Sequence, residues 1–116
     1  MIIEIPFKTP TINHLYYHRG NIKILKKEAR ELRKRIYELI TPKPELNKPL
    51  KVEIEVYENW FTLKNDVKRK DVFNREKFLI DSVFKALEVD DKFIFEITIK
   101  KKQSEKEKSI IKINLL

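Results

Sequence analysis

The sequence predicts an α+β fold with one mixed β-sheet and two helices, in the order β-α-β-α-β-β, over a single domain of residues 1–116. Two segments with apolar residues three and four positions apart predict the helices, and four segments with alternating apolar residues predict the strands. The length of 116 residues suits one domain with one hydrophobic core. The chain has no run of about 18 apolar residues, so no membrane span is expected.

The first half of the chain is expected to form one strand, one loop and one helix. Within residues 2–7, Ile3 and Ile5 alternate with Glu4 as in a strand, and Pro6 confines this strand to an end or an edge. Residues 8–21 carry proline, asparagine and glycine without an apolar period, which predicts a loop. Residues 26–40 carry one apolar stripe at helical spacing, and Pro42 ends that helix.

The second half is expected to form a strand, a helix and two further strands. Residues 50–63 alternate valine and isoleucine with charged residues, which predicts a strand with one buried face. The basic segment 64–70 then leads to a helix with one apolar stripe. The stripe consists of Leu79, Ile80, Val83, Phe84 and Leu87. Residues 93–100 and 109–116 predict strands, and the charged residues 102–108 between them predict a hairpin loop.

The net charge of +8 favours a polyanionic partner, and nucleic acid is the first candidate. Basic residues cluster at 26–35, 64–70 and 100–102, although each cluster taken alone also fits a solvated face. The absence of cysteine excludes disulfides, thiolate catalysis and cysteine-based zinc sites, and it suits the cytoplasm, where the protein is expected to act. Any metal chemistry would therefore use carboxylates or histidine.

Carboxylates lie at both ends of the second predicted helix. Asp71 precedes the helix, and Asp90 and Asp91 follow it. If the strands at 50–63 and 93–100 are neighbours, the two ends of the helix could converge on one edge of the sheet. Mg²⁺ accepts one or two carboxylates together with water and substrate phosphate, so acids on a basic surface suit phosphodiester hydrolysis. A helix cap and a turn are the alternative reading of the same residues.

The stretch DVFNREKFLIDSVFKALEVDD resembles the central motif of the RusA-type Holliday-junction endodeoxyribonucleases. That motif runs Asp-x-Asp-Asn, then a lysine three residues on, an aspartate within the helix and an Asp-Asp pair after it. The matching residues are Asp71, Asn74, Lys77, Asp81, Asp90 and Asp91. PTINHLYYHRG is similar to the amino-terminal segment of the family at Pro10, Asn13 and Tyr16. The resemblance covers nearly the whole chain, so residues 1–116 are expected to be one RusA-like domain.

The resemblance implies a homodimeric, Mg²⁺-dependent endonuclease, with Mn²⁺ as an alternative ion, that resolves four-way DNA junctions by paired incisions in recombination and repair. Asp71, Lys77 and Asp91 would be the catalytic residues, and Asp71, Asp91 and Asp90 the metal ligands. Contacts with the nucleic acid are expected from Asn13, Tyr16, Arg19, Lys68, Arg69, Lys70 and Asn74.

The chain departs from the family motif at Phe73, which stands where the motif has its second aspartate. A phenyl ring cannot bind Mg²⁺. Either the site works with fewer carboxylates, or Asp66, Glu76 or Asp81 substitutes, or the protein binds junctions and cuts them poorly. For Asp81 an i,i+4 salt bridge with Lys77 is favoured over metal binding. A catalytically impaired junction-binding protein and a generic basic nucleic-acid-binding module therefore remain as alternatives.

Several other side chains have both a structural and a functional reading. His14 and His18 lack a recognisable catalytic partner, so they are expected to be polar loop residues or phosphate contacts. Tyr16 and Tyr17 suit either base stacking or packing against the sheet. Trp60 continues a strand pattern and is assigned to the core or to a dimer interface.

Overall fold

The computed structural model describes residues 1–10, 16–72 and 75–116, and the chain forms two compact units. We call the first the sheet unit; it comprises Met1–Lys8, Lys48–Phe73 and Lys92–Leu116. The second, the helical unit, comprises Thr9–Asn47 and Asn74–Asp91. Each unit combines segments that lie far apart in the sequence. The single RusA-like domain over residues 1–116 stays a prediction.

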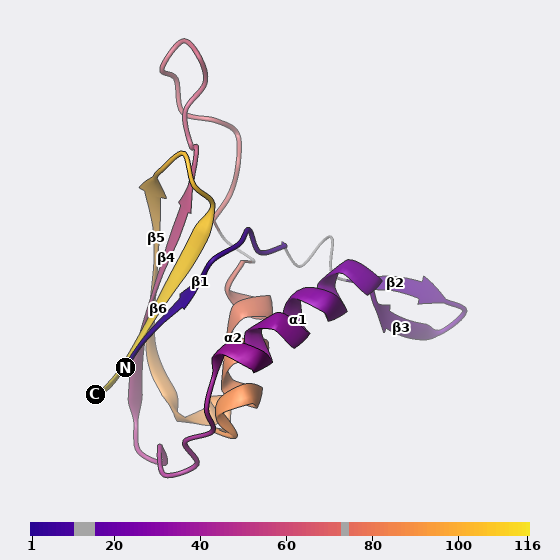
Figure 1. Cartoon of the computed structure of the whole chain (residues 1–116), viewed down its shortest axis with the longest axis vertical. Helices are drawn as coiled ribbons and strands as arrows, with labels where there is room; N and C mark the ends of the chain where they lie inside the picture. The colour runs from indigo at the N-terminus through magenta and orange to yellow at the C-terminus, as the bar shows by residue number, and fades with distance from the viewer. Residues whose placement is uncertain (11–15, 73–74) are drawn as a thin grey trace. The chain divides into compact units, whose positions relative to one another are not determined.

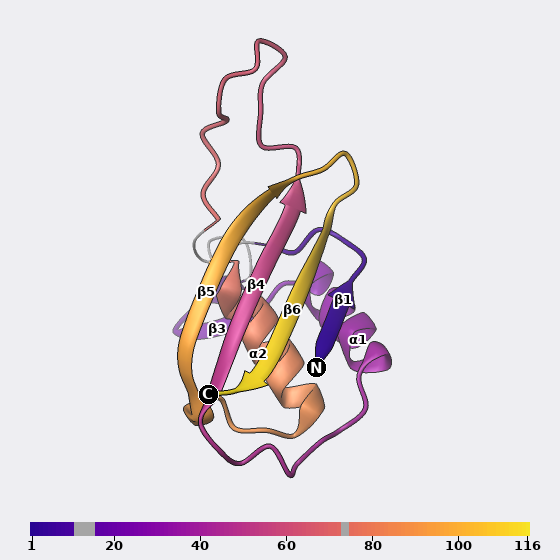
Figure 2. The same ribbon diagram turned by 90° about the vertical axis from the view of Figure 1, so that its left-hand side faces the viewer.

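The sheet unit contains a four-stranded mixed sheet (Figures 1 and 2). Its strands are β1 (Ile2–Ile5), β4 (Leu50–Glu58), β5 (Ile94–Gln103) and β6 (Lys108–Leu115). They lie in the order β1-β6-β4-β5, with β4 parallel to β5 and antiparallel to β6. With the two helices described below, this sheet confirms the predicted fold class.

The buried face of this sheet follows from the alternation of the sequence. In β4, the residues at even positions from Leu50 to Glu58 are buried, while Lys51, Glu53 and Tyr57 are partly exposed. Successive side chains of a strand point to opposite faces, so the even positions form one face with the inward residues of β6. The apolar members of this face are Leu50, Val52, Ile54, Val56, Ile111 and Ile113.

The connection between β5 and β6 differs from the predicted hairpin. The two strands do not pair with each other, because β4 lies between them in the sheet. The prediction of a hairpin loop at residues 102–108 was therefore wrong, although a short charged turn does join the strands. A charged turn identifies a connection between strands but does not specify which strands are neighbours.

The helical unit contains α1 (Lys27–Leu39), α2 (Glu76–Leu87) and a two-stranded sheet. Arg33 of α1 donates a hydrogen bond from Nε to Oγ of Ser82 at 3.2 Å, and its guanidinium lies over the ring of Phe78 at 5.8 Å. The two helices therefore contact each other through both polar and apolar groups. Neither helix in the part of the chain that the structure describes is long and apolar enough to span a membrane.

The two-stranded sheet is a hairpin of β2 (Tyr16–Arg19) and β3 (Ile22–Leu25), which pair antiparallel. The prediction of a loop over residues 8–21 was wrong for this part of the segment. Gly20 occupies the turn with φ of +63°, a conformation that glycine adopts without steric cost. The Gly-Asn pair between two strand-length runs is a hairpin signal that the polar composition of β2 obscured.

Candidate functional site

The predicted site residues are divided between the two units. Lys68, Arg69, Lys70 and Asp71 belong to the sheet unit, and Lys77, Asp90 and Asp91 belong to the helical unit. Asn13 and Asn74, which were predicted to contact nucleic acid, lie outside the described residues, as do His14 and Phe73.

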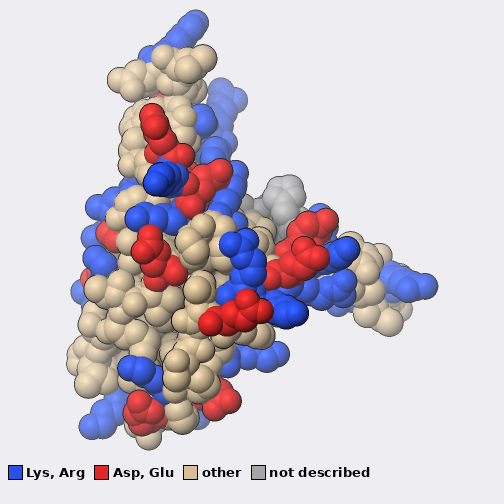
Figure 3. Space-filling model, in the orientation of Figure 1, with Lys and Arg blue, Asp and Glu red and all other residues tan. Residues whose placement is uncertain are grey.

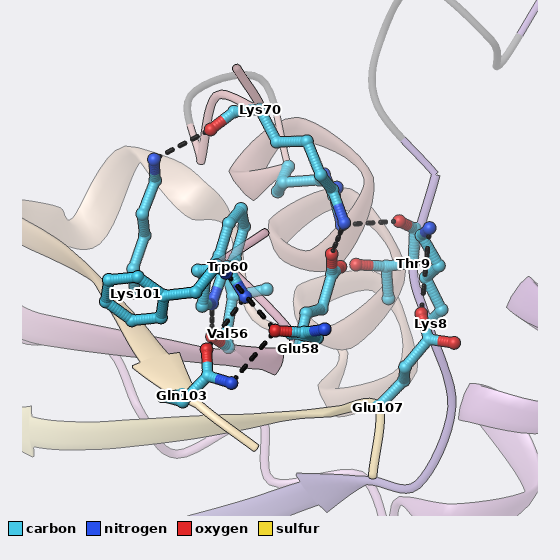
Figure 4. Close-up of polar contacts among 12 residues, drawn as sticks. Lys8, Thr9, Val56, Glu58, Trp60, Lys70, Lys101, Gln103 and Glu107 are labelled. Carbon is cyan, nitrogen blue, oxygen red and sulfur yellow. Dashed lines mark hydrogen bonds and ion pairs between the residues drawn. The ribbon is translucent and has the colours of Figure 1, made fainter. Parts of the chain in front are cut away.

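In the sheet unit, the backbone that leads into Asp71 is fixed through Lys70 (Figure 4). The ammonium of Lys70 lies 2.6 Å from Oε2 of Glu58, and its carbonyl oxygen accepts a hydrogen bond from Nζ of Lys101 at 2.7 Å. Both ammonium groups lie over the ring of Trp60, at 5.1 Å for Lys70 and 4.8 Å for Lys101. The residue before the predicted metal ligand is thus held at both its side chain and its backbone.

Trp60 is the centre of this cluster. The residue was predicted to lie in the core or in a dimer interface, and it is buried in the core. Its ring N–H donates to the carbonyl oxygen of Val56 at 3.1 Å, and its backbone N–H donates to Oε1 of Gln103 at 2.8 Å. Because a cation over an indole ring is attracted by the ring quadrupole, the ring of Trp60 also stabilises the two lysines beside it.

Glu58 is a buried carboxylate that the sequence reasoning did not single out. It is 1 % exposed and projects from β4 on the same side as Val56, Ile54 and Val52. The signal was present in the alternation of the strand, because continuing the apolar positions by two residues beyond Val56 leads to Glu58. A carboxylate at such a position requires a charged or hydrogen-bonding partner, and Lys70 is one.

The pairing of Lys70 bears on its predicted contact with nucleic acid. Its side chain is 30 % exposed, and its ammonium is engaged with Glu58, so it lies against the protein's own carboxylate. Arg69, by contrast, is exposed, and Lys68 is partly exposed. These two neighbours are better placed for phosphate contacts than Lys70.

In the helical unit, Lys77 lies in the first turn of α2. Its ammonium is 3.2 Å from Oδ2 of Asp81, one helical turn further on, which confirms the predicted i,i+4 salt bridge. Arg75, in the cap position, is buried and donates from Nη1 to the carbonyl oxygen of Thr9 at 3.2 Å. This bond joins the beginning of α2 to the segment that precedes β2, a contact that the sequence did not reveal.

Asp90 and Asp91 lie beyond the opposite end of the same helix. Both residues are exposed, and Asp91 opens the short 3₁₀-helix η2 (Asp91–Phe93). A helix of 12 residues is about 18 Å long, so α2 keeps these carboxylates well away from Lys77. Within one chain, Lys77, the predicted catalytic lysine, and the carboxylates predicted at the far end of the motif do not meet.

The sheet unit also holds the residues next to Asp71 and next to Asp91 far from each other. Because β5 is parallel to β4, Ile94 lies beside Leu50 at the beginning of β4, whereas Lys101 lies beside Val56 near its end. Lys101 binds the residue before Asp71, and Lys92, the residue after Asp91, leads into the beginning of β5. The seven residue steps of strand from Ile94 to Lys101 span roughly 23 Å. The predicted strands are neighbours, but the expected convergence of the two ends of the motif on one edge was wrong.

The described residues do not contain a group of three or more His, Asp or Glu side chains placed to hold a metal ion. This finding agrees with the separation of Asp71 from the Asp90–Asp91 pair. One chain alone brings together only part of the predicted ligand set.

The β2–β3 hairpin carries the amino-terminal candidates for contacts with nucleic acid. Tyr16 is partly exposed and pairs with Leu25, and the ammonium of Lys23 lies 4.3 Å from the centroid of its ring. Tyr17, His18 and Arg19 are exposed. An aromatic ring next to exposed cations is a surface on which an unpaired base can stack.

The sequence was compared with the models of known protein families. Residues 6–114 match the family model described as Endodeoxyribonuclease RusA. The matched range includes both candidate segments, from the amino-terminal hairpin to the motif around α2. No curated protein matches the sequence significantly.

Proposed function

Because the chain belongs to the RusA endodeoxyribonuclease family, we propose that it is a divalent-metal-dependent endonuclease that resolves four-way DNA junctions. The observation that carries this proposal is the family match over nearly the whole chain, together with the motif residues at Asp71, Lys77, Asp90 and Asp91. Recombination and repair in the cytoplasm is the setting that we propose for the reaction.

The separation of the motif residues supports a shared site in a homodimer. An isologous interface places residue i of one protomer against residue j of its partner, and j against i. Two antiparallel copies of α2 would therefore bring Lys77 of each protomer to the partner's Asp91. A dimer built in this way has two equivalent sites, as paired incisions require. Each site combines Asp71 and Lys77 of one protomer with the partner's Asp90 and Asp91.

The chemistry of these donors suits Mg²⁺ or Mn²⁺, which bind carboxylate oxygens and retain water and phosphate ligands. Asp71 of one protomer and the partner's Asp91, assisted by Asp90, would hold the ion. When bound, it supplies Lewis-acid activation of the phosphate and of water. Lys77 would hold a phosphate oxygen at the beginning of α2, where the helix dipole also favours an anion.

The basic surface is proposed to hold the DNA arms. On the face drawn in Figure 3, basic side chains are interspersed with acidic ones, in keeping with a net charge of +8. Arg69 and Lys68 would contact phosphates next to Asp71, and Tyr16 and Arg19 would contact bases or phosphates from the hairpin. Lys70 would act mainly through its ion pair with Glu58. Asn13 and Asn74 are proposed to contact the nucleic acid because they match the family motif.

A labelled four-way junction incubated with Mg²⁺ and then with Mn²⁺ tests the proposal. Symmetric paired cuts are expected. Phe73, in place of a motif aspartate, favours one second candidate function, a junction-binding protein with little activity. Tight junction binding without cleavage would identify that function. Equal affinity for the junction and for linear duplex would contradict both.

Junction affinity is expected to fall by roughly a hundredfold or more between about 50 and about 200 mM salt, if several phosphate contacts form. The reason is that each neutralised phosphate releases condensed counterions, and this release is less favourable at high salt. Fluorescence anisotropy with Ca²⁺ in place of Mg²⁺ measures the slope without cleavage. A flat salt response would remove the electrostatic basis of the proposal.

Phe73→Asp is expected to raise the rate of Mg²⁺-dependent cleavage while leaving junction affinity in Ca²⁺ nearly unchanged. One more carboxylate holds the ion more firmly, whereas DNA binding depends on lysines and arginines elsewhere. Phe73→Asn is the matched control, since it has the same size as aspartate but carries no charge. A folded Phe73→Asp protein that gains neither activity nor thermal stabilisation by Mg²⁺ would show that position 73 lies outside the site.

A further inference from the structure

The segment between β4 and Asp71, residues 59–70, forms a projecting arm in the sheet unit (Figures 1 and 2). The arm extends beyond the end of β4 and returns, with a bridge between Phe61 and Val67. At its tip, the backbone N–H of Thr62 donates to the carbonyl oxygen of Asp66 at 2.8 Å, and that of Asn65 donates to the carbonyl oxygen of Thr62 at 2.9 Å. The tip is therefore a hydrogen-bonded turn.

Hydrogen bonds and an ion pair also hold the base of the arm in place. The backbone N–H of Lys68 donates to the carbonyl oxygen of Trp60 at 2.8 Å, which joins the two sides of the arm above the buried indole. Lys70 is fixed to Glu58 and Lys101, as described above. A structured arm with an anchored base holds its tip in a defined position relative to Asp71, which follows directly.

The tip carries apolar side chains that this chain does not cover. Leu63 is fully exposed, at 109 % of its reference area, and Val67 is 66 % exposed. A hollow of about 430 Å³ lies along the arm, and Leu63, Lys68 and Gln103 of β5 are among the residues that line it. Leaving a leucine in water at the end of an ordered turn gains no stability for the fold.

The surroundings of Leu63 are basic. The arm carries Lys64, Lys68, Arg69 and Lys70 against a single carboxylate, Asp66. A hydrophobic protein partner would be met by this positive charge, whereas a DNA partner would present phosphates to the lysines and stacked bases to the leucine. Apolar wedges such as leucine insert between base steps in DNA-bending proteins, where they replace lost stacking. The charge of the arm therefore selects DNA as the occupant.

We propose that the arm reads the branch point of the junction, with Leu63 inserted between the base pairs at the crossover and the basic residues beside it on the flanking phosphates. This inference rests on the proposed function. In the open form of a junction, base pairs at the branch lack a stacking neighbour on one side, so insertion there disrupts less stacking than in a continuous duplex. Leu63 thereby favours a junction over linear DNA, and the arm sets the position of Asp71 relative to the crossover.

The test uses a four-way junction with 2-aminopurine at the branch, and Ca²⁺ to prevent cleavage. Wild-type protein is expected to raise the fluorescence, because the probe brightens when it is unstacked. Leu63→Ala should remove most of this rise and lower the ratio of junction to duplex affinity roughly tenfold. Leu63→Phe, which keeps an apolar wedge, should retain both. Leu115→Ala, at a leucine of β6 that is 63 % exposed, is the matched control and should behave as wild type.

Each contrary result has a separate meaning. If wild-type protein prefers the junction and Leu63→Ala keeps that preference and the fluorescence rise, the arm does not read the branch. Loss of the dimer in Leu63→Ala, measured by light scattering, would make Leu63 a contact with a second copy and would also overturn the proposal. If wild-type protein shows no preference for the junction, the proposed function fails first.

Discussion

Mixing Asp71→Asn with Asp91→Asn protein is expected to restore cleavage that neither variant shows alone. Each substitution should slow cleavage by roughly a hundredfold or more, because a lost metal ligand costs several kcal/mol of transition-state stabilisation. In a mixed dimer with shared sites, both substitutions fall in one site and the other site is intact. After random exchange of protomers, about half of the dimers are mixed and each has one intact site, so about a quarter of all sites are intact.

The product of the mixed dimer is as informative as its rate. Because only one of its two sites is intact, it should nick the junction rather than cut it on paired strands. A mixture of Asp71→Asn with Lys77→Ala is the control. In the shared arrangement these two residues serve the same site, so every site of that dimer keeps a defect and cleavage should not return. Native mass spectrometry with one tagged variant verifies that exchange occurred.

The complementation can fail in two distinguishable ways. Mixed dimers that form but stay inactive, alongside an active wild type, would place Asp71 and Asp91 in one chain's site or outside the site altogether. A wild-type protein that does not cleave would instead favour the junction-binding alternative. In that case, binding of Mn²⁺ to the mixed dimer can still be compared with binding to each parent.

Lys70→Met is expected to lower the free energy of unfolding by about 3 kcal/mol. The substitution leaves Glu58, which is 1 % exposed, without the ammonium that lies 2.6 Å from its Oε2. The cost of a buried carboxylate that has lost its ionic partner exceeds the attraction that a surface pair provides. Urea unfolding, followed by the fluorescence of the single tryptophan, measures the change.

The double variant Glu58→Met with Lys70→Met separates loss of the pair from loss of packing. It should recover much of the stability that Lys70→Met loses, because the buried carboxylate that faced Lys70 is removed as well. Lys51→Met is the control, since Lys51 lies 3.5 Å from Glu53 in a more exposed pair and its loss should cost under about 1 kcal/mol. Equal stability of Lys70→Met and wild type would mean that Glu58 does not depend on this lysine.

The elements with strong periodicity could be predicted from the sequence. In α1, α2 and β4, the spacing of the apolar residues within the element identifies the face that is buried. The salt bridge of Lys77 with Asp81 followed from helical spacing alone. In each case the contact or the burial depends on residues within one element, so local sequence is sufficient.

The pairing of strands could not be predicted in the same way. The sequence between β5 and β6 has the length and charge of a hairpin turn, yet β4 separates the two strands. Which strands become neighbours depends on the packing of the whole sheet. The same limit affected the candidate site, because the position of Asp91 relative to Asp71 depends on β5 running parallel to β4.

The place of β6 in the sheet has a consequence for how the protein folds. β6 is the last strand in the chain, and it lies between β1, which is the first, and β4. Ile2 pairs with Lys112, and the N-terminal ammonium donates to the carbonyl oxygen of Ile113 at 3.0 Å. β1 can therefore pair in this sheet only after β6 has been synthesised. Pairing between strands so far apart in the sequence raises the contact order, which predicts slow folding.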